Sequence, residues 1–225
     1  IGVGLEADLF ENLIEINFEP YYKYHGLLIN LNRNKLRAGD PNYIAETGEA
    51  YGIDFFARYD RNYLYLWATY SLAYVDRNDG FQTYPTNFDR RHNVNLLATY
   101  RFGADKQWEA GARWNLGSGF PFTQIRGYFG DYPFLQPNDL DYVSGNPDVR
   151  PIFDNNLNRG RLPYYHRMDL SLKRFIELGR YTNLEITASV TNAYDRKNIF
   201  YYDVIELERV DQLPILPSLA AKFTF

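Results

Sequence analysis

A strict two-residue alternation of apolar and polar side chains constrains this chain more than any other feature. Between residues 91 and 102, one set of alternate positions holds Val94, Leu96, Ala98, Tyr100 and Phe102, and the other set holds mostly polar residues, namely Arg91, Asn93, Asn95, Thr99 and Arg101. Successive side chains of a β-strand point to opposite faces, whereas a helix would distribute these residues around its circumference. The pattern therefore predicts a strand with one apolar and one polar face.

The same alternation recurs along the whole sequence and predicts an all-β chain. The expected strands occupy residues 2–9, 13–30, 48–59, 63–75, 91–102, 107–116, 162–175, 183–190 and 215–225. Aromatic residues make up 18% of the chain, with 21 Tyr and 16 Phe, which agrees with the preference of aromatic side chains for strands. No segment shows helical periodicity of comparable quality. We therefore expect nine strands in a single domain over residues 1–225.

The connections between these strands alternate in length. Short turns at residues 10–12, 60–62, 103–105 and 177–180 are interleaved with long loops at 31–47, 76–89, 119–161 and 195–214. In an up-and-down meander, alternate connections lie on the same side, so all long loops lie at one end. Outer-membrane barrels combine short periplasmic turns with long extracellular loops. The sequence thus predicts a transmembrane antiparallel up-and-down β-barrel in a bacterial outer membrane, with its C-terminus in the periplasm.

A soluble antiparallel barrel or sandwich is the alternative, because its strands also alternate. Bulky rings near the strand ends favour the membrane interpretation, since transmembrane barrels carry aromatic girdles there; examples are Tyr70, Tyr74, Tyr100, Phe102, Trp108 and Trp114. The opposite face mixes charged residues with Gly and Ser, which suits a hydrated lumen. Lipid on one face and water on the other is therefore the favoured environment.

The strand count indicates that the wall is incomplete. Single-chain bacterial barrels have an even number of strands and both termini in the periplasm, whereas nine strands place the termini on opposite sides. Nine strands alone would also leave two open edges in lipid, where unpaired backbone groups are costly. We therefore expect this chain to be the C-terminal part of a larger barrel.

Composition excludes several classes of function. The chain has 24 Lys and Arg against 28 Asp and Glu, a net charge of −4, which argues against a nucleic-acid-binding surface. It has no Cys, which excludes disulfides, thiolate metal sites and cysteine nucleophiles within it. The pairs Asp89/His92 and His166/Asp169 could act in acid–base chemistry, but histidines at strand ends are more often girdle or rim residues. No catalytic residue and no cofactor is predicted.

The longest predicted loop is the candidate ligand-binding element. Its aromatic residues could form stacking surfaces for a solute, or could pack the loop against itself; they are Tyr128, Phe129, Tyr132, Phe134 and Tyr142. The loop also holds five aspartates, Asp131, Asp139, Asp141, Asp148 and Asp154, whose oxygens suit calcium. Their spacing matches no EF-hand loop and is ordinary turn chemistry. We therefore assign no metal site.

Charged residues on the polar faces of the strands form a second candidate surface. They are Arg91, Arg101, Glu109, Arg113, Arg167, Asp169, Lys173 and Glu185. These side chains would face the lumen, where they could form a polar wall against a plug or a solute. They could equally form a ladder of opposite charges that neutralise one another across neighbouring strands.

The last strand carries a possible assembly signal. Leu219, Ala221, Phe223 and Phe225 share one face, and the chain ends in an aromatic residue. This resembles the C-terminal signal of bacterial outer-membrane proteins, which the barrel-assembly machinery reads by strand addition.

Seven stretches resemble the C-terminal barrel region of TonB-dependent outer-membrane receptors, especially Bacteroidetes-like ones. They are AYGIDFFARY (50–59), WATYSLAYVDR (67–77), FDRRHNVNLLATYRFG (88–103), GSGFPFT (117–123), RLPYYHRMDLSLKR (161–174), NAYDRKNIFYYD (192–203) and LPILPSL (213–219). Each is only a strand end with a loop entry, but their order and spacing agree with that family along the whole chain.

The resemblance implies a 22-stranded barrel of which these nine strands are the last. It also implies an N-terminal plug domain that contacts TonB, although no plug or TonB box is present in this sequence. The expected function is binding and import of a scarce solute, such as a siderophore, cofactor, glycan or peptide, through the outer membrane. A structural or assembly barrel subunit, paired with other outer-membrane proteins, is the second hypothesis, and an enzyme barrel is the third.

Overall fold

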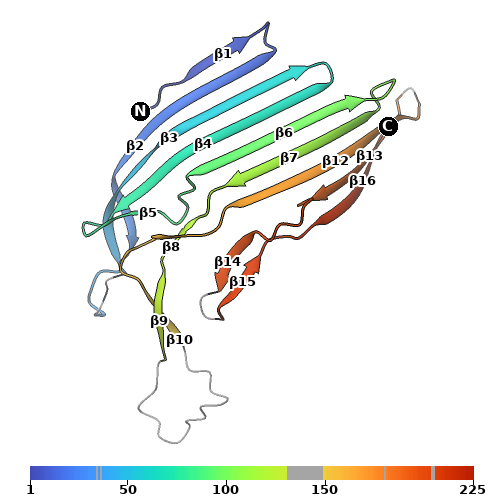
Figure 1. Ribbon diagram of the computed structural model, residues 1–225. Helices are drawn as coiled ribbons and strands as arrows, with labels where there is room; N and C mark the ends of the chain where they lie inside the picture. The colour runs from blue at the N-terminus through green and yellow to red at the C-terminus, as the bar shows by residue number, and fades with distance from the viewer. Residues whose placement is uncertain (34, 36, 131–148, 180, 204–205) are drawn as a thin grey trace, which may run out of the picture.

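The computed structural model describes residues 1–225 except 34, 36, 131–148, 180 and 204–205, and this part of the chain contains strands and no helix. Nine long antiparallel strands form one sheet in the order β1-β2-β3-β4-β6-β7-β12-β13-β16, so each strand pairs with the next long strand in the sequence (Figure 1). They are β1 (Leu5–Leu9), β2 (Ile14–Leu31), β3 (Tyr43–Arg61), β4 (Leu64–Asn78), β6 (His92–Phe102), β7 (Trp108–Gly117), β12 (Tyr165–Glu177), β13 (Asn183–Thr191) and β16 (Leu216–Thr224). The nine predicted strands are confirmed, and β3 begins five residues earlier than expected.

Seven short strands, which alternation along the sequence did not predict, lie within the long connections. β5 (Thr83–Pro85) extends the sheet beside β4. The others pair as β8 (Pro121–Phe122) with β11 (Gly160–Arg161), β9 (Ile125–Gly130) with β10 (Val149–Phe153), and β14 (Ile199–Asp203) with β15 (Glu208–Asp211). They are too short for a periodic pattern to distinguish them from turns.

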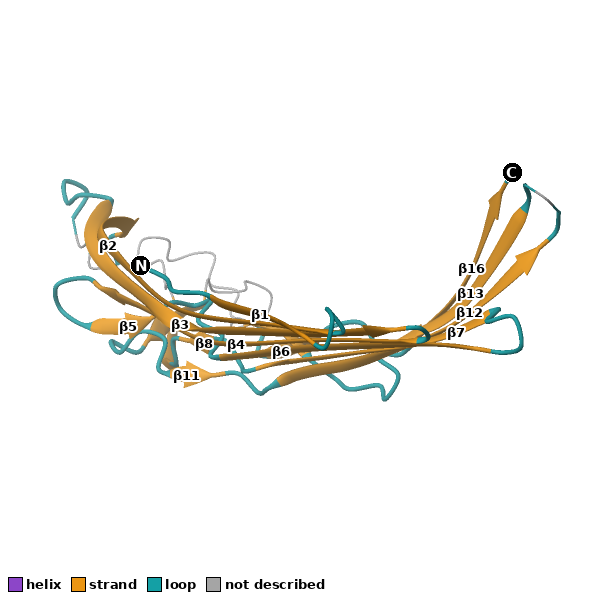
Figure 2. Cartoon of the chain, turned by 90° about the horizontal axis from the view of Figure 1, so that it is seen from above, coloured by secondary structure: helices purple, strands orange, loops and turns teal. Residues whose placement is uncertain are grey.

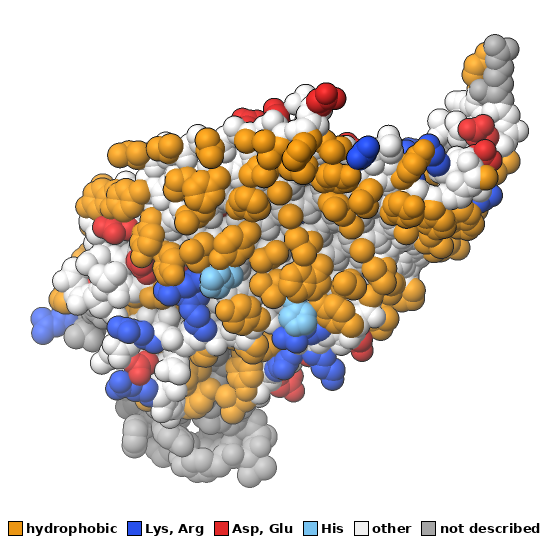
Figure 3. All heavy atoms as spheres, turned by 45° about the horizontal axis from the view of Figure 1, so that its top comes forward, with side chains coloured by type: hydrophobic (Ala, Val, Ile, Leu, Met, Phe, Trp, Pro, Cys, Tyr) orange, Lys and Arg blue, Asp and Glu red, His pale blue; other side chains and the backbone are white. Residues whose placement is uncertain are grey.

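The register places most of the apolar side chains of the nine long strands on one face of the sheet, although Phe56, Trp67 and Leu97 lie on the other face. One row runs from Ile16 through Ala57, Ala68 and Leu96 to Trp114, and the next rows repeat the pattern. The sheet is curved, with the ends of β2 and β3 rising on the same side as β13 and β16 (Figure 2). Hydrophobic side chains cover its convex face (Figure 3), which leaves the polar side chains on the concave face.

The sheet has no apolar core of its own. Tyr84 and Pro121 are the only buried apolar residues in the described part of the chain, and large side chains of the convex face such as Leu96 and Leu172 remain 42% and 41% exposed. A compact 26.5 kDa monomer exposes about 10,700 Å², whereas this chain exposes 16348 Å². A single layer with one apolar face needs an apolar medium against that face, and the hydrocarbon of a bilayer provides it.

Short and long connections lie at opposite ends of the sheet, as the alternating lengths predicted (Figure 1). The short turns use left-handed backbone where the chain reverses; Phe10, Glu11 and Asn12 have φ of 55°, 59° and 66°, and Asn62 has φ of 49°. Such values are costly for Phe and Glu and ordinary for Asn. We call the two ends of the sheet the short-turn end and the long-loop end.

β1 and β16 are the two edges of the sheet and do not pair with each other. The chain therefore forms an open part of a barrel wall and not a closed nine-stranded barrel. No helix in the described residues is long and apolar enough to cross a membrane.

Candidate functional site

Nearly all buried residues gather at the long-loop end, and most of them are polar. Besides Pro121 and four glycines, the described residues that are less than a tenth exposed are Glu46, Tyr84, Thr86, Asp89, Ser118, Asn158, Asn192 and Asn198. Buried polar groups are stable only when they are hydrogen-bonded. Their partners show how the long loops are held over the end of the barrel wall.

The Glu46 carboxylate ties β2, β3, β4 and β5 together on the concave face. Its Oε1 accepts hydrogen bonds from Tyr84 Oη at 2.7 Å and from Asn30 Nδ2 at 3.0 Å, and its Oε2 lies 3.3 Å from Arg77 Nη1. Burial and the hydrogen bond to this carboxylate raise the pKa of Tyr84 to about 12, so the phenol stays protonated and remains a donor.

Asp89 joins the loop before β6 to the far side of the longest loop. Its side chain is fully buried, accepts a hydrogen bond from Val75 N at 3.1 Å and pairs with the guanidinium of Arg161. Arg161 Nη1 also donates to the backbone oxygens of Asp89 at 3.0 Å and Gly119 at 3.3 Å. One arginine therefore fixes two loop segments that are separated by 72 residues in the sequence.

Asn192 and Asn198 fold the connection that follows β13. The Asn192 amide donates to the backbone oxygens of Arg196 and Leu213 at 3.0 and 3.1 Å. The Asn198 amide donates to His166 O at 2.9 Å and accepts from His166 N at 3.2 Å, so its side chain replaces a backbone partner for β12. The β14–β15 hairpin is thereby held beside the end of β12.

Three further hydrogen bonds connect the β4–β6 loop with the β10–β11 segment. Gln82 Nε2 donates to Asn155 O at 2.9 Å and its Oε1 accepts from Leu157 N at 3.2 Å, while Asn158 Nδ2 donates to Pro85 O at 2.8 Å. The long loops therefore form one connected layer and not separate arms.

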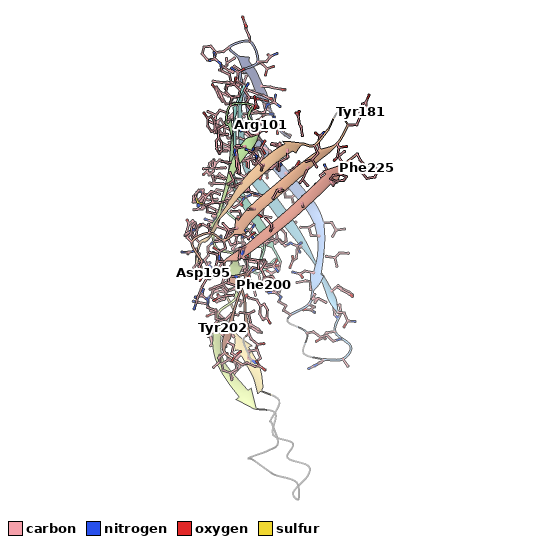
Figure 4. The ribbon with its side chains drawn as sticks, turned by 90° about the vertical axis from the view of Figure 1, so that its right-hand side faces the viewer. Arg101, Tyr181, Asp195, Phe200, Tyr202 and Phe225 are labelled. Carbon is pink, nitrogen blue, oxygen red and sulfur yellow. The ribbon has the colours of Figure 1, made fainter. Side chains whose placement is uncertain are left out.

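A pocket of about 490 Å³ opens where this layer meets the sheet. Its wall comes from the loop before β6, the segments around Gly119 and Leu162, and the β14–β15 hairpin; the lining residues are Arg90, Ser118, Gly119, Phe120, Leu162, Pro163, Tyr164, Tyr165, Arg196, Lys197, Asn198, Ile199, Phe200, Arg209 and Gln212. We call it the Arg90 pocket. Figure 4 labels Phe200 and Asp195 at this end of the wall and Arg101, Tyr181 and Phe225 at the other end.

Backbone contact at Gly119 shapes the pocket. A Cβ on Gly119 would lie 1.5 Å from Leu162 O, so no side chain fits where the two segments cross. The crossing is closed by a hydrogen bond from Leu162 N to Phe120 O at 3.0 Å. Gly119 is therefore required for the pocket to exist in this form.

Arg90 occupies the concave side of the pocket. A Cβ on Gly117 would lie 2.6 Å from Arg90 Cζ, so the guanidinium rests on the open space that this glycine leaves. Gly117 is four residues after Arg113 in β7, and both residues therefore lie on the concave face of the sheet. The guanidinium carbon also lies 4.3 Å from the ring centre of Phe120 and 5.6 Å from that of Tyr165.

The environment of Arg90 is unusual for an arginine. Its Nε is buried and has no hydrogen-bond partner in the described part of the chain. Burial lowers the pKa of the guanidinium below its ordinary value, although arginine remains charged at neutral pH. The two flanking rings stabilise the cation through their faces. The local composition of FDRRHN does not indicate this environment, which arises only when three loops meet.

Most of the loop aromatics expected to bind a ligand lie outside the described residues. Tyr132 and Phe134 fall in the undescribed segment together with Tyr142, and only the backbone of Phe129 is described. Tyr128 lies in β9, opposite Pro151 of β10, and is 38% exposed. Their role in binding remains a prediction.

Four of the predicted lumen-facing charges lie side by side on the concave face near the short-turn end. Arg101 Nε lies 2.8 Å from Glu109 Oε2, and Lys173 Nζ lies 3.6 Å from Glu109 Oε1 and 3.3 Å from Glu185 Oε1. The chain of pairs crosses four adjacent strands, as a ladder of alternating charges would. These partly exposed pairs contribute little to stability individually.

The other four predicted lumen residues are more dispersed. Arg167 pairs with Asp169 at 2.9 Å, and Asp169 also accepts a hydrogen bond from Asn192 N at 3.0 Å. Arg113 is exposed and lies opposite Asp169 in the register. Arg91 lies before β6 begins, 4.5 Å above the ring of Tyr74 and 3.5 Å from Asp89 Oδ2. It therefore belongs to the long-loop end, where the strand alternation no longer applies.

The histidines and aspartates of the two candidate acid–base pairs contact other residues and not each other. His92 Nδ1 lies 3.0 Å from Tyr70 Oη and His166 Nδ1 lies 2.7 Å from Tyr194 Oη, whereas Asp89 and Asp169 pair with arginines. Among the described residues, no group of three or more His, Asp or Glu side chains is placed to hold a metal ion.

The predicted assembly signal forms the outer edge of the sheet. Leu219, Ala221 and Phe223 lie opposite Ala188, Ile186 and Leu184 of β13 and continue the apolar face. Phe225 follows the end of β16, and its ring centre lies 6.1 Å from that of Phe223. Recognition by an assembly machinery remains a prediction.

The whole chain superimposes on part of a solved outer-membrane protein. It matches the ferripyoverdine receptor of the outer membrane of Pseudomonas aeruginosa bound to ferripyoverdine, with a TM-score of 0.68 and 10% identity, over 100% of this chain and 26% of that chain. The fold is that of an outer-membrane receptor barrel. A second solved structure, the FpvAI–pyocin S2 complex, matches with a TM-score of 0.67 and 10% identity, over 100% of this chain and 27% of the other.

These matches concern the fold. No family model and no curated protein matches the sequence. The chain spans about a quarter of the receptor chain that it matches, so the predicted 22-strand total and the Bacteroidetes-like resemblance remain predictions.

Proposed function

We propose that this chain forms part of the wall of an outer-membrane receptor that binds a scarce solute at its long-loop end for TonB-coupled import. The observation that carries the proposal is the superposition of the whole curved sheet on a receptor barrel. In the proposed orientation, the long loops lie outside the cell, and the short turns and the end of β16 lie in the periplasm. Contact with TonB would require a plug domain, and barrel insertion would require the assembly machinery.

The organisation of the long-loop end supports a role in binding. Loops that only connect strands need no common framework, yet here Asp89, Arg161 and Gln82 tie segments that are more than seventy residues apart. A preorganised loop layer loses less conformational entropy when a ligand binds. The Arg90 pocket lies beneath this layer, has a volume of about 490 Å³, and falls within the range of small-molecule sites.

The proposal is tested by solute depletion. Cells that produce the protein and otherwise identical cells lacking its gene are grown in nutrient-limited medium, and solutes remaining in the medium are compared by mass spectrometry. We expect at least one solute to be depleted only by the producing cells, and a protonophore should abolish this depletion because import would be energy-coupled. Equal depletion by both strains, with stoichiometric co-purification of other outer-membrane proteins, would instead support a structural or assembly subunit.

A further inference from the structure

We propose that the Arg90 pocket binds the anionic group of an organic solute, a carboxylate or phosphate carried on an apolar or aromatic body. This inference rests on the proposed receptor function and specifies the chemical class of its solute. It depends on the charges, the unsatisfied donor and the rings that meet in this pocket.

The pocket is lined by cations without a balancing set of acids. Arg90, Arg196, Lys197 and Arg209 line it, and no Asp or Glu is among the described lining residues. Arg209 pairs with Asp211, whose Oδ1 lies 2.6 Å from Arg209 Nε. In the described part of the chain, the other three cations of the wall have no carboxylate within ion-pair distance. Elsewhere on the concave face, positive charges alternate with carboxylates, so the excess is specific to this pocket.

The cations have different roles. Arg196 uses its Nε for Asn198 Oδ1 at 3.2 Å and its Nη2 for Tyr164 O at 2.9 Å, so it mainly holds the pocket wall. Lys197 is exposed at the opening. Arg90 has a buried Nε without a partner, and a buried unsatisfied donor costs free energy unless a ligand accepts its hydrogen bond. Arg90 is therefore the anchor for an anion.

The remaining wall fits an organic body. Phe120, Tyr164, Tyr165 and Phe200 supply four rings to the pocket, and Leu162, Pro163 and Ile199 supply aliphatic surface. The guanidinium carbon lies over the rings of Phe120 and Tyr165, so both rings stabilise the cation while its N–H groups remain the donors available to an anion. Planar bidentate donation is the geometry that carboxylate and phosphate groups accept best.

The test uses the intact outer-membrane protein, purified in detergent, with trimesate (benzene-1,3,5-tricarboxylate) as the anionic probe. Its neutral analogue, 1,3,5-benzenetrimethanol, is the ligand control, and binding is measured by titration calorimetry at constant ionic strength. Arg90→Gln removes the charge, and Gly117→Ala displaces the guanidinium because the new Cβ would lie 2.6 Å from its Cζ. Arg58→Gln removes an equal charge elsewhere on the concave face.

We expect trimesate to bind the unaltered protein and the Arg58→Gln variant equally, and the neutral analogue to bind neither. Arg90→Gln and Gly117→Ala should each weaken trimesate binding about tenfold or more, the effect of losing a charge-assisted hydrogen bond. Equal binding of the two probes, absence of trimesate binding, or equal affinity in all variants would overturn the inference. Failure of the receptor proposal is recognised separately, because solute depletion would then not depend on the gene even if trimesate bound.

Discussion

At the scale of single residues, polar side chains supply the buried structure of this protein. Glu46, Asp89 and Asn192 are almost completely buried, and each is hydrogen-bonded or ion-paired to groups at least twenty residues away. A curved single-layer wall with lipid on one face and water on the other has no interior in which apolar residues could hold its loops. Hydrogen bonds and ion pairs therefore perform this role at the long-loop end.

Asp89→Asn should destabilise the long-loop end by about 2 to 3 kcal/mol. Removing one partner of a fully buried ion pair costs roughly 3–5 kcal/mol, and the cost is lower here because the Arg161 side chain is 30% exposed. Denaturant unfolding of the intact protein in lipid vesicles measures the change. Asp105→Asn, in an exposed short turn, is the control and should stay within about 0.5 kcal/mol. Equal stability of the two variants would contradict the structural role of Asp89.

At the scale of elements, each long strand is defined by its two faces. The apolar sets of neighbouring strands meet in register, as where Ala188 lies between Leu172 and Leu219, while adjacent Ser189 lies between Ser171 and Ser218 on the other face. A one-residue slip would exchange the faces of a whole strand. Alternation alone therefore predicts strand positions and pairing well.

Ala188→Arg and Ser189→Arg should differ strongly although the two residues are adjacent. In the proposed orientation Ala188 faces lipid, where arginine costs about 2–4 kcal/mol near the bilayer midplane. Ser189 faces the concave, hydrated side, where its side chain loses the 2.7 Å hydrogen bond with Ser218 Oγ. Unfolding in lipid vesicles measures both variants. Similar costs at the two positions would indicate water or protein on both faces.

At the scale of the whole molecule, all long connections lie at one end of an open, curved sheet. This arrangement follows from the antiparallel meander, because every second connection returns to the same end. The position of the Arg90 pocket at that end relates it to the proposed extracellular side. Orientation in the membrane is therefore the property of the whole molecule on which the functional proposal most depends.

A cysteine introduced at Asn155 should react with a membrane-impermeant thiol reagent on intact cells, whereas one at Ala104 should not. Asn155 lies exposed in the long-loop layer and Ala104 in a short turn, and this chain contains no native cysteine. Cysteines at Asn34 and Asp139, which belong to the predicted long loops at 31–47 and 119–161, should also react, but these two positions lie outside the described residues. Permeabilised cells provide the control, since both cysteines should then react. Labelling at Ala104 in sealed cells would reverse the proposed orientation.

The sequence by itself determined the nine long strands, their two faces, the alternation of short and long connections and the open edges. These features arise from local periodicity, because a strand's alternation is read from its own residues. The tertiary structure alone decided that Asp89 pairs with Arg161 and not with His92, that Arg91 contacts Tyr74, and that Arg90 rests on Gly117 beside Phe120. These contacts join distant loops without regular periodicity, and their geometry is set by where the strands bring the loop ends together.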